Sequence, residues 1–196
     1  MNRINDILEI LNSSVPLGEE ITPNGARLIG LVKDEQLGIR RWWHFIFPGL
    51  TEDQVSDLEK AVGIPFPAVF SEYLKDMNGL TAFSGALCIY GARLSLDRRS
   101  KDAFPYALQT PNSVERPKDA SPDMFFIGGY NWDGSKIYMD LQTGRVFRCS
   151  RESAKPLNEW PDFWSMLISE ISRISALYES DGRKKNLSEP TAPISG

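Results

Sequence analysis

Residues 50–79 read LTEDQVSDLEKAVGIPFPAVFSEYLKDMNG, and this stretch decides the fold because it predicts two consecutive helices with a sharp break between them. Thr51 and Gln54 have the spacing of a capping box, in which each residue hydrogen-bonds the backbone of the other. Gly63 suits the left-handed backbone that ends many helices. The sequence therefore predicts a first helix that begins after Thr51 and ends at Gly63.

The second helix of this stretch begins at Pro67, because the first turn of a helix tolerates a residue without an N–H group. Asn78 and Gly79 predict its end. The helix carries a wide apolar face of the kind that is turned toward a core. That face is made by Val69, Phe70, Tyr73, Leu74 and Met77.

The rest of the chain changes to the short apolar runs and alternating patterns of strands. Residues 26–47 hold two such runs, and residues 135–141 and 145–149 flank a Gln-Thr-Gly turn and predict a hairpin. Further strands are expected at residues 86–90, 93–96 and 124–127. The strands are few residues apart along much of the chain, which favours an antiparallel meander.

Helical spacing returns at the two ends of the chain. Residues 4–11 predict a short helix, and residues 160–178 predict a long one with a continuous apolar stripe. We therefore expect the α+β class, with an antiparallel meander packed by N-terminal helices and a long C-terminal helix. Residues 1–180 are expected to form a single domain, and the polar residues 181–196 a disordered tail.

Composition favours a cytoplasmic protein that binds neither nucleic acid nor a membrane. The chain has 196 residues and a net charge of −4, whereas nucleic-acid-binding domains are usually basic. No run approaches the roughly 18 apolar residues of a membrane span, and the N-terminus lacks the pattern of a secretory signal. Cys88 and Cys149 fall in apolar stretches without metal-ligand spacing, which indicates buried, reduced thiols.

The usual marks of an enzyme are missing from the sequence. The one histidine, His44, lies between Trp43 and Phe45, a context typical of a structural residue. There is no serine-hydrolase elbow, phosphate-binding loop or zinc-ligand pattern. We therefore predict no catalytic site, no cofactor and no metal.

Three aspartates leave one enzymatic alternative open. Asp123, Asp133 and Asp140 are clustered around the β series, and paired carboxylates can perform acid–base hydrolysis. Asp133 is followed by Gly134, however, and Asp-Gly is a typical turn dipeptide. We favour turn residues over a hydrolase that uses Asp133 and Asp140.

Aromatic residues at two places are candidates for a protein-binding surface, where Tyr and Trp are enriched. The connecting turn GGYNWDG of residues 128–134 contributes Tyr130, Asn131, Trp132 and Asp133, and a second patch comprises Trp42 and Trp43. An alternative, in which Trp132 folds back on the sheet, is equally compatible with the sequence.

The order of these motifs over residues 48–175 resembles the SUKH superfamily, which includes fungal cell-wall-synthesis regulators of the Smi/Knr type. The resemblance begins with the two helices of residues 50–79. It continues in the Ile127-Gly128 strand end, the Asp133-Gly134 turn, and the strand that closes in Asp140 before Gly144-Arg145-Val146-Phe147. Residues 1–47 extend beyond the usual start of the family, and the connection 97–123 is long.

The resemblance implies a protein-binding module without a catalytic site. Bacterial members resemble immunity proteins that neutralise toxins, often nucleases, and fungal and animal members resemble regulatory adaptors. We therefore expect a protein partner, first a cognate bacterial toxin, with a regulatory adaptor as the alternative. An acidic chain would complement a basic nuclease. The sequence leaves the oligomeric state unknown.

Overall fold

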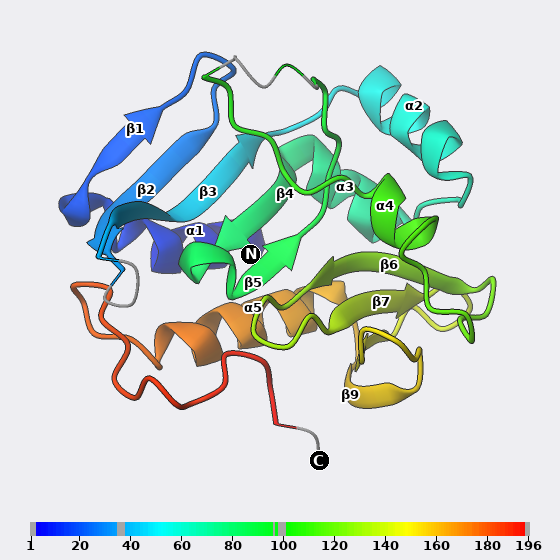
Figure 1. Cartoon of the computed structure of the whole chain (residues 1–196). Coiled ribbons are helices and arrows are strands. Elements are labelled where there is room, and N and C mark those ends of the chain that lie inside the picture. Colours follow the sequence, from blue (N-terminus) through cyan, green and yellow to red (C-terminus); the bar gives the residue numbers. More distant parts are fainter. Residues whose placement is uncertain (1–2, 35–37, 96, 98–100, 195–196) are drawn as a thin grey trace.

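The chain folds around one antiparallel meander in which the nine strands described follow each other in sequence order from β1 to β9 (Figure 1). The computed structural model describes residues 3–34, 38–95, 97 and 101–194. The strands are β1 (Glu19–Ile21), β2 (Arg27–Lys33), β3 (Arg40–Pro48), β4 (Met77–Ala82), β5 (Leu87–Ile89), β6 (Met124–Gly129), β7 (Lys136–Asp140), β8 (Val146–Cys149) and β9 (Pro156–Trp160).

Helices from both ends and from the middle of the chain pack on this sheet. They are α1 (Arg3–Asn12), α2 (Glu52–Val62), α3 (Ala68–Asp76), α4 (Gln109–Asn112) and α5 (Phe163–Ser175), with 3-10 turns η1 (Val15–Leu17) and η2 (Phe83–Gly85). Helices α1 and α5 contact each other beneath the sheet, and α2 and α3 lie together at its far end (Figure 1). The predicted α+β class and antiparallel meander are confirmed.

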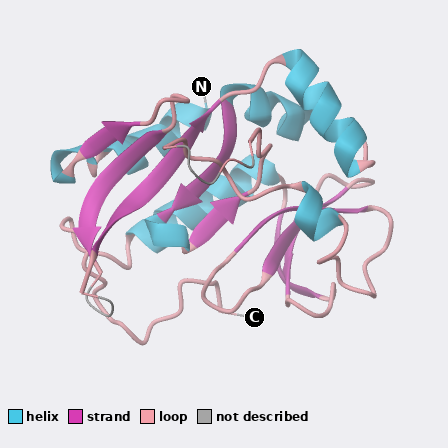
Figure 2. Cartoon of the chain, turned by 45° about the horizontal axis from the view of Figure 1, so that its top comes forward, coloured by secondary structure: helices cyan, strands magenta, loops and turns pink. Residues whose placement is uncertain are grey.

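The sheet twists strongly between β5 and β6, where few residues of the two strands pair. Only the pairs Cys88–Gly129 and Ile89–Gly128 join these strands. A Cβ atom on Gly128 would lie 2.5 Å from the carbonyl oxygen of Cys88, so glycine permits this close approach. Figure 2 shows the first strands nearly face-on and β6 to β9 nearly edge-on, so the junction carries a strong twist.

One apolar core joins the two groups of strands to the helices. At its centre, Phe70 of α3 packs edge-on against Phe125 of β6 and Phe163 of α5, with ring centroids 5.2 and 5.7 Å away. Residues 19–47, part of the predicted N-terminal extension of residues 1–47, supply β1, β2 and nearly all of β3 of the same sheet. The extension is therefore built into the fold.

Local capping explains α2. Thr51 Oγ1 accepts a hydrogen bond from the Gln54 amide at 3.2 Å, and Gln54 Oε1 accepts one from the Thr51 amide at 2.9 Å. Gly63 ends the helix with φ of 73°. The prediction for this helix is confirmed in full.

The end of α3 differs from the prediction. Met77 and Asn78 belong to β4, because the Asn78 side chain exchanges two hydrogen bonds with the backbone of Ala92, at 2.6 and 2.9 Å. The expected strand at residues 93–96 does not form over residues 93–95, and residue 96 lies outside the described residues. Trp160 ends β9 and is not helical, because Asp162 caps α5 by accepting from the Ser165 amide at 2.9 Å.

The C-terminal segment, residues 181–194, packs along α5 and reaches the β2–β3 hairpin, in contrast to the predicted disorder of residues 181–196 (Figure 1). Thr191 and Ala192 are buried. The guanidinium groups of Arg173 and Arg148 donate hydrogen bonds to the carbonyl oxygens of Thr191 and Pro193, at 2.6 and 2.7 Å. Polar composition predicted disorder, but side chains far away in sequence satisfy this backbone. Residues 195–196 lie outside the described residues.

Candidate functional site

His44 and the two cysteines, the side chains first considered for acid–base or nucleophilic chemistry, are buried. His44 is 1% exposed, and its Nδ1 accepts a hydrogen bond from the Phe83 amide at 3.2 Å. Burial lowers the pKa of His44 to about 3, so the ring is neutral near pH 7. Burial likewise raises the pKa of Cys88 to about 12 and that of Cys149 to about 11. The sequence prediction of a structural histidine and two buried, free thiols is confirmed.

The two aspartates of the hydrolase alternative serve as turn residues at opposite ends of β7. Asp133 Oδ1 accepts from the Ser135 amide at 3.0 Å, and Asp140 Oδ1 accepts from the Thr143 amide at 2.8 Å. Asp133 precedes the five-residue strand β7 and Asp140 is its last residue, so most of the strand's length of roughly 16 Å lies between them. Paired hydrolytic carboxylates lie within about 10 Å of each other, so this pair does not form such a site.

The part of the chain that the structure describes holds no group of three or more His, Cys, Asp or Glu residues placed to bind a metal ion. None of the helices described is long and apolar enough to cross a membrane.

The aromatic turn, residues 130–135, presents one aromatic side chain and buries the other. Trp132 is 47% exposed, whereas Tyr130 is 2% exposed and donates a hydrogen bond from its hydroxyl to Glu170 Oε2 at 2.8 Å. Burial, followed by the nearby Glu170 carboxylate, raises the pKa of Tyr130. Tyr130 thus anchors the turn, and the expectation that it contacts a partner directly does not fit its place in the core.

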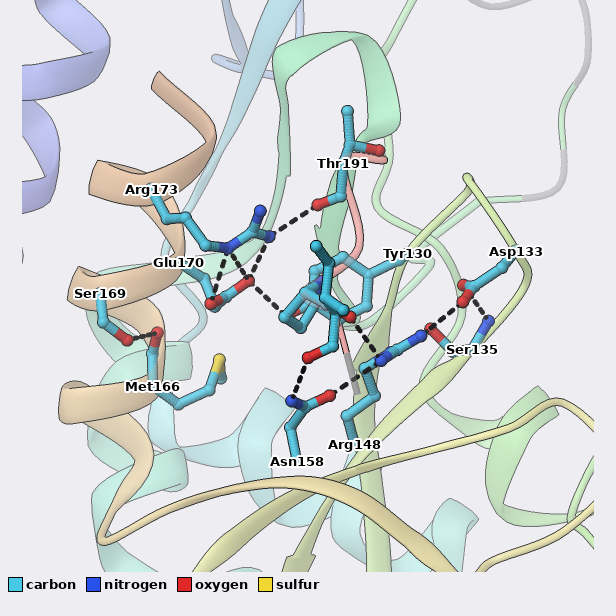
Figure 3. A network of polar contacts seen from close by, with 12 residues as sticks. Tyr130, Asp133, Ser135, Arg148, Asn158, Met166, Ser169, Glu170, Arg173 and Thr191 are labelled. Atoms are coloured by element: carbon cyan, nitrogen blue, oxygen red, sulfur yellow. Dashed lines mark hydrogen bonds and ion pairs between the residues drawn. The ribbon is translucent and has the colours of Figure 1, made fainter. Parts of the chain in front are cut away.

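A network of hydrogen bonds around Arg148 fixes the aromatic turn (Figure 3). The buried guanidinium of Arg148 donates to Asp133 Oδ2 at 2.5 Å, to Ser135 Oγ at 2.9 Å and to Asn158 Oδ1 at 2.8 Å. Partial burial opposes ionisation of Asp133, but the hydrogen bonds from Ser135 and Arg148 outweigh it, and the pKa of Asp133 is lowered. Asp133 therefore positions the turn as an ionised partner of Arg148.

A hollow of about 370 Å³ opens beside the turn, and we call it the aromatic hollow. It brings together Trp43, Asn131 and Trp132, which the sequence had placed in two separate patches. Trp42, Tyr130 and Asp133 do not line it. The lining is Val32, Lys33, Asp34, Arg41, Trp43, Phe83, Ser84, Ala86, Asn131, Trp132, Tyr178, Gly182, Arg183, Lys184, Leu187 and Thr191.

The floor of the hollow is aromatic. Trp43 packs edge-on against Phe83 and Tyr178, with ring centroids 5.5 and 5.3 Å away, and Phe83 stacks on Tyr178 at 5.9 Å. Trp43 is only 5% exposed, so its ring lines the bottom of the hollow and does not project toward a partner. Trp132 stands at the rim, where the ammonium of Lys184 lies 4.5 Å from its ring centroid.

One wall of the hollow has a strained backbone. Phe83 and Ser84 have φ of 53° and 56°, and they are the non-glycine residues with positive φ among those described. A bulky residue in this conformation costs about 1–3 kcal/mol, and such residues are concentrated at functional sites. Strain beside an exposed tryptophan makes the aromatic hollow the candidate site.

Two further hollows carry weaker indications. One, of about 230 Å³, lies on the other side of the aromatic turn, where Lys136 is already paired with Glu115 at 3.3 Å. The other, of about 650 Å³, is lined by Tyr90, Tyr106 and the connection that follows β5. Neither has a residue with strained backbone in its lining among the residues described.

Sequence reasoning missed much of the aromatic hollow. Phe83 and Ser84 carry no local signal of a left-handed backbone, since Phe and Ser rarely adopt it. Tyr178 was assigned to the helix stripe, and Lys184 and Leu187 to a disordered tail. The clue that the sequence does carry is the run of three basic residues at positions 183–185 of that tail.

Comparison with protein-family models gives a match to the SMI1 / KNR4 family (SUKH-1) over residues 49–169, which is more than half of the chain. Comparison with curated proteins gives no significant match. The matched region contains the two helices of residues 50–79 and the aromatic turn.

Proposed function

Because the chain belongs to the SMI1 / KNR4 family (SUKH-1), we propose that it works by binding a protein, and that it is an immunity protein which neutralises a cognate bacterial toxin through the aromatic hollow. The family includes both immunity proteins and regulators. A binder of this kind needs a complementary surface and no reactive group. The buried state of His44 and of both thiols is in accord with that requirement.

The observation that carries the proposal is the exposed ring of Trp132 on a turn that is held in place. Its ring is about half exposed, yet the turn beneath it is fixed by Asp133 and Arg148, and Lys184 lies over its face. Tryptophan is among the residue types most enriched in the few side chains that carry most of the binding energy of protein interfaces. A ring already held in place loses little conformational freedom on binding, which favours affinity.

The net charge of −4 supports a basic partner, such as a nuclease, at the stage of encounter. Complementary net charge speeds association and orients the two proteins before contact. We propose that the encounter takes place in the cytoplasm. The two free cysteines agree with a reducing compartment.

The test starts with capture. The purified chain is used as bait in a lysate of its native organism, at low and at high salt, since salt screens surface charge. The captured protein is then expressed in a heterologous host with and without the chain. The proposal predicts that it arrests growth alone and that co-expression of the chain restores growth.

The control is the Trp132→Ala variant, which should capture less of the partner and restore less growth. A captured protein that is harmless when expressed alone would contradict the immunity function and favour a regulatory adaptor. Capture of no protein by the wild-type chain would contradict both.

A further inference from the structure

The aromatic hollow is basic although the whole chain is acidic. Among the described residues that line it, four side chains are basic and one is acidic. The basic ones are Lys33, Arg41, Arg183 and Lys184, and the acidic one is Asp34. The local charge is therefore opposite in sign to the net charge of −4.

Part of this basic charge is already neutralised by ion pairs with acidic residues of the chain. Arg41 pairs with Asp34 at 3.0 Å, and Arg183 pairs with Asp181 at 2.7 Å. Lys33 is exposed at the end of β2. With Glu189, whose charge acts on Lys184, three acids face four bases, and the described residues leave the rim one positive charge in excess.

Lys184 is held in a position that favours an anion. Its ammonium lies over Trp132 and donates hydrogen bonds to the carbonyl oxygens of Leu187 and Glu189. Burial lowers the pKa of Lys184, with the charge of Glu189 acting in the opposite direction. The ammonium is thus fixed at the rim, where an incoming carboxylate would meet a positive charge already in place.

Many exposed acids of the chain lie away from the hollow. Helices α2 and α3, at the far end of the sheet in Figure 1, carry exposed carboxylates on their outer faces. They include Glu52, Asp53, Asp57 and Asp76. The segregation leaves the hollow basic while the chain as a whole stays acidic.

We propose that the aromatic hollow receives an acidic segment of the protein partner. One aromatic or aliphatic side chain of the segment packs on the floor of Trp43, Phe83 and Tyr178. Carboxylates that flank it pair with Lys33 and Lys184. This inference rests on the proposed function and specifies the docking chemistry, since a toxin of basic net charge can still present a local acidic loop.

Single-stranded nucleic acid is the competing occupant, because it too uses aromatic rings and basic side chains. A protein segment is favoured by the small extent of the basic rim. A phosphate backbone carries one charge on every nucleotide and needs a longer basic track than this rim offers.

The test is a selection of random twelve-residue peptides on the immobilised full chain. We expect the selected peptides to be rich in Asp and Glu around an aromatic or aliphatic residue. A synthetic copy of the strongest binder, labelled with fluorescein, should bind at least tenfold more weakly to Lys33→Glu and to Lys184→Glu. It should bind normally to Lys155→Glu, a charge reversal at an exposed position outside the hollow.

Lys184→Glu also disturbs the C-terminal segment, so Lys33→Glu is the deciding variant. Selection of basic or uncharged peptides, failure to select any, or equal binding by Lys33→Glu would overturn the inference. The labelled peptide is also displaced by its own unlabelled copy and by an oligothymidylate of equal length. Displacement by the oligothymidylate at a lower concentration than the unlabelled peptide requires would overturn the inference in favour of nucleic acid.

The inference and the proposed function can fail separately. A captured toxin that is neutralised equally well by the wild-type chain and by the Lys33→Glu, Lys184→Glu double variant would leave the immunity function standing and remove the acidic segment. An acidic peptide that binds the hollow while no toxin is captured would do the reverse.

Discussion

Helix α2 and the aromatic turn are both fixed by side-chain hydrogen bonds, but these bonds span very different distances along the chain. The capping box of α2 joins Thr51 to Gln54, three residues away. The aromatic turn depends on Tyr130 bound to Glu170, 40 residues away, and on Arg148, which reaches Pro193 across 45 residues. A local rule therefore forms the helix, whereas the whole chain must fold before the candidate site exists.

The largest effect is expected where the long-range contacts meet, at Arg148. Arg148→Met removes hydrogen bonds to Asp133, Ser135 and the C-terminal segment and leaves their acceptors unpaired. We expect the free energy of unfolding to fall by about 3 kcal/mol. Urea titration followed by circular dichroism measures this, and limited proteolysis should show earlier cleavage within residues 181–194.

The matched control for Arg148→Met is a substitution at Arg145, which lies just before β8, the strand that holds Arg148. Arg145 pairs with Glu159 at the surface, with its side chain more than half exposed. Arg145→Met should cost less than about 1 kcal/mol, because exposed ion pairs contribute little. Equal losses for the two variants would contradict the central place given to Arg148.

The second effect concerns pH and the buried His44. In the folded chain the pKa of His44 is lowered to about 3, whereas the ordinary value is 6.5. As the pH falls below 6.5, the unfolded chain binds this proton and the folded chain does not. The contribution of His44 to the free energy of unfolding should therefore fall by about 2 kcal/mol between pH 8 and pH 5.

Because the chain has one histidine, nitrogen chemical shifts of the imidazole report this directly. The ring should remain neutral at pH 5. A titration midpoint near 6.5 in the folded protein would show that His44 is solvated and would contradict its place in the core.

The sequence was a good guide where contacts are local. The capping box, Gly63, and the hairpin of β7 and β8 were all predicted, because neighbouring residues in the sequence determine each of them. The ordered motifs also pointed to the family that residues 49–169 match. The boundaries of α3 and α5 were misplaced where a side chain such as Asn78 or Asp162 bonds the backbone.

The candidate site was predicted only in part. Trp132, Asn131 and Trp43 were named, but the sequence could not show that β3 and the aromatic turn share one hollow. Residue alternation did not reveal that Tyr130 is an internal anchor for Glu170. The C-terminal segment was assigned as disordered because composition says nothing about Arg148 and Arg173, which hold it.

A third, smaller effect tests the local side of the comparison. Thr51→Ala removes the cap of α2 and should lower the free energy of unfolding by about 1 kcal/mol. Ser56→Ala, at an exposed position inside the same helix, should leave it unchanged or slightly higher. Urea titration of both variants checks this, and a Thr51→Ala loss as large as that of Arg148→Met would erase the contrast.

The smallest effect is expected at Tyr73 in the core. Its hydroxyl is buried and has no hydrogen-bond partner among the described residues. Tyr73→Phe keeps the ring contacts with Phe70 and Phe163 and removes a desolvated polar group. The free energy of unfolding should stay constant or rise by up to about 1 kcal/mol, whereas a clear loss in urea titration would reveal a partner for the hydroxyl.

The most direct test of the account is the affinity of Trp132→Ala for the captured toxin, measured by isothermal titration calorimetry beside Tyr106→Ala. Tyr106 is also about half exposed but lies outside the aromatic hollow. We predict at least a tenfold higher Kd for Trp132→Ala, about 1.4 kcal/mol, with the Tm and the Tyr106→Ala affinity unchanged. Wild-type affinity in Trp132→Ala would show that the partner binds elsewhere and would contradict the aromatic hollow as the functional site.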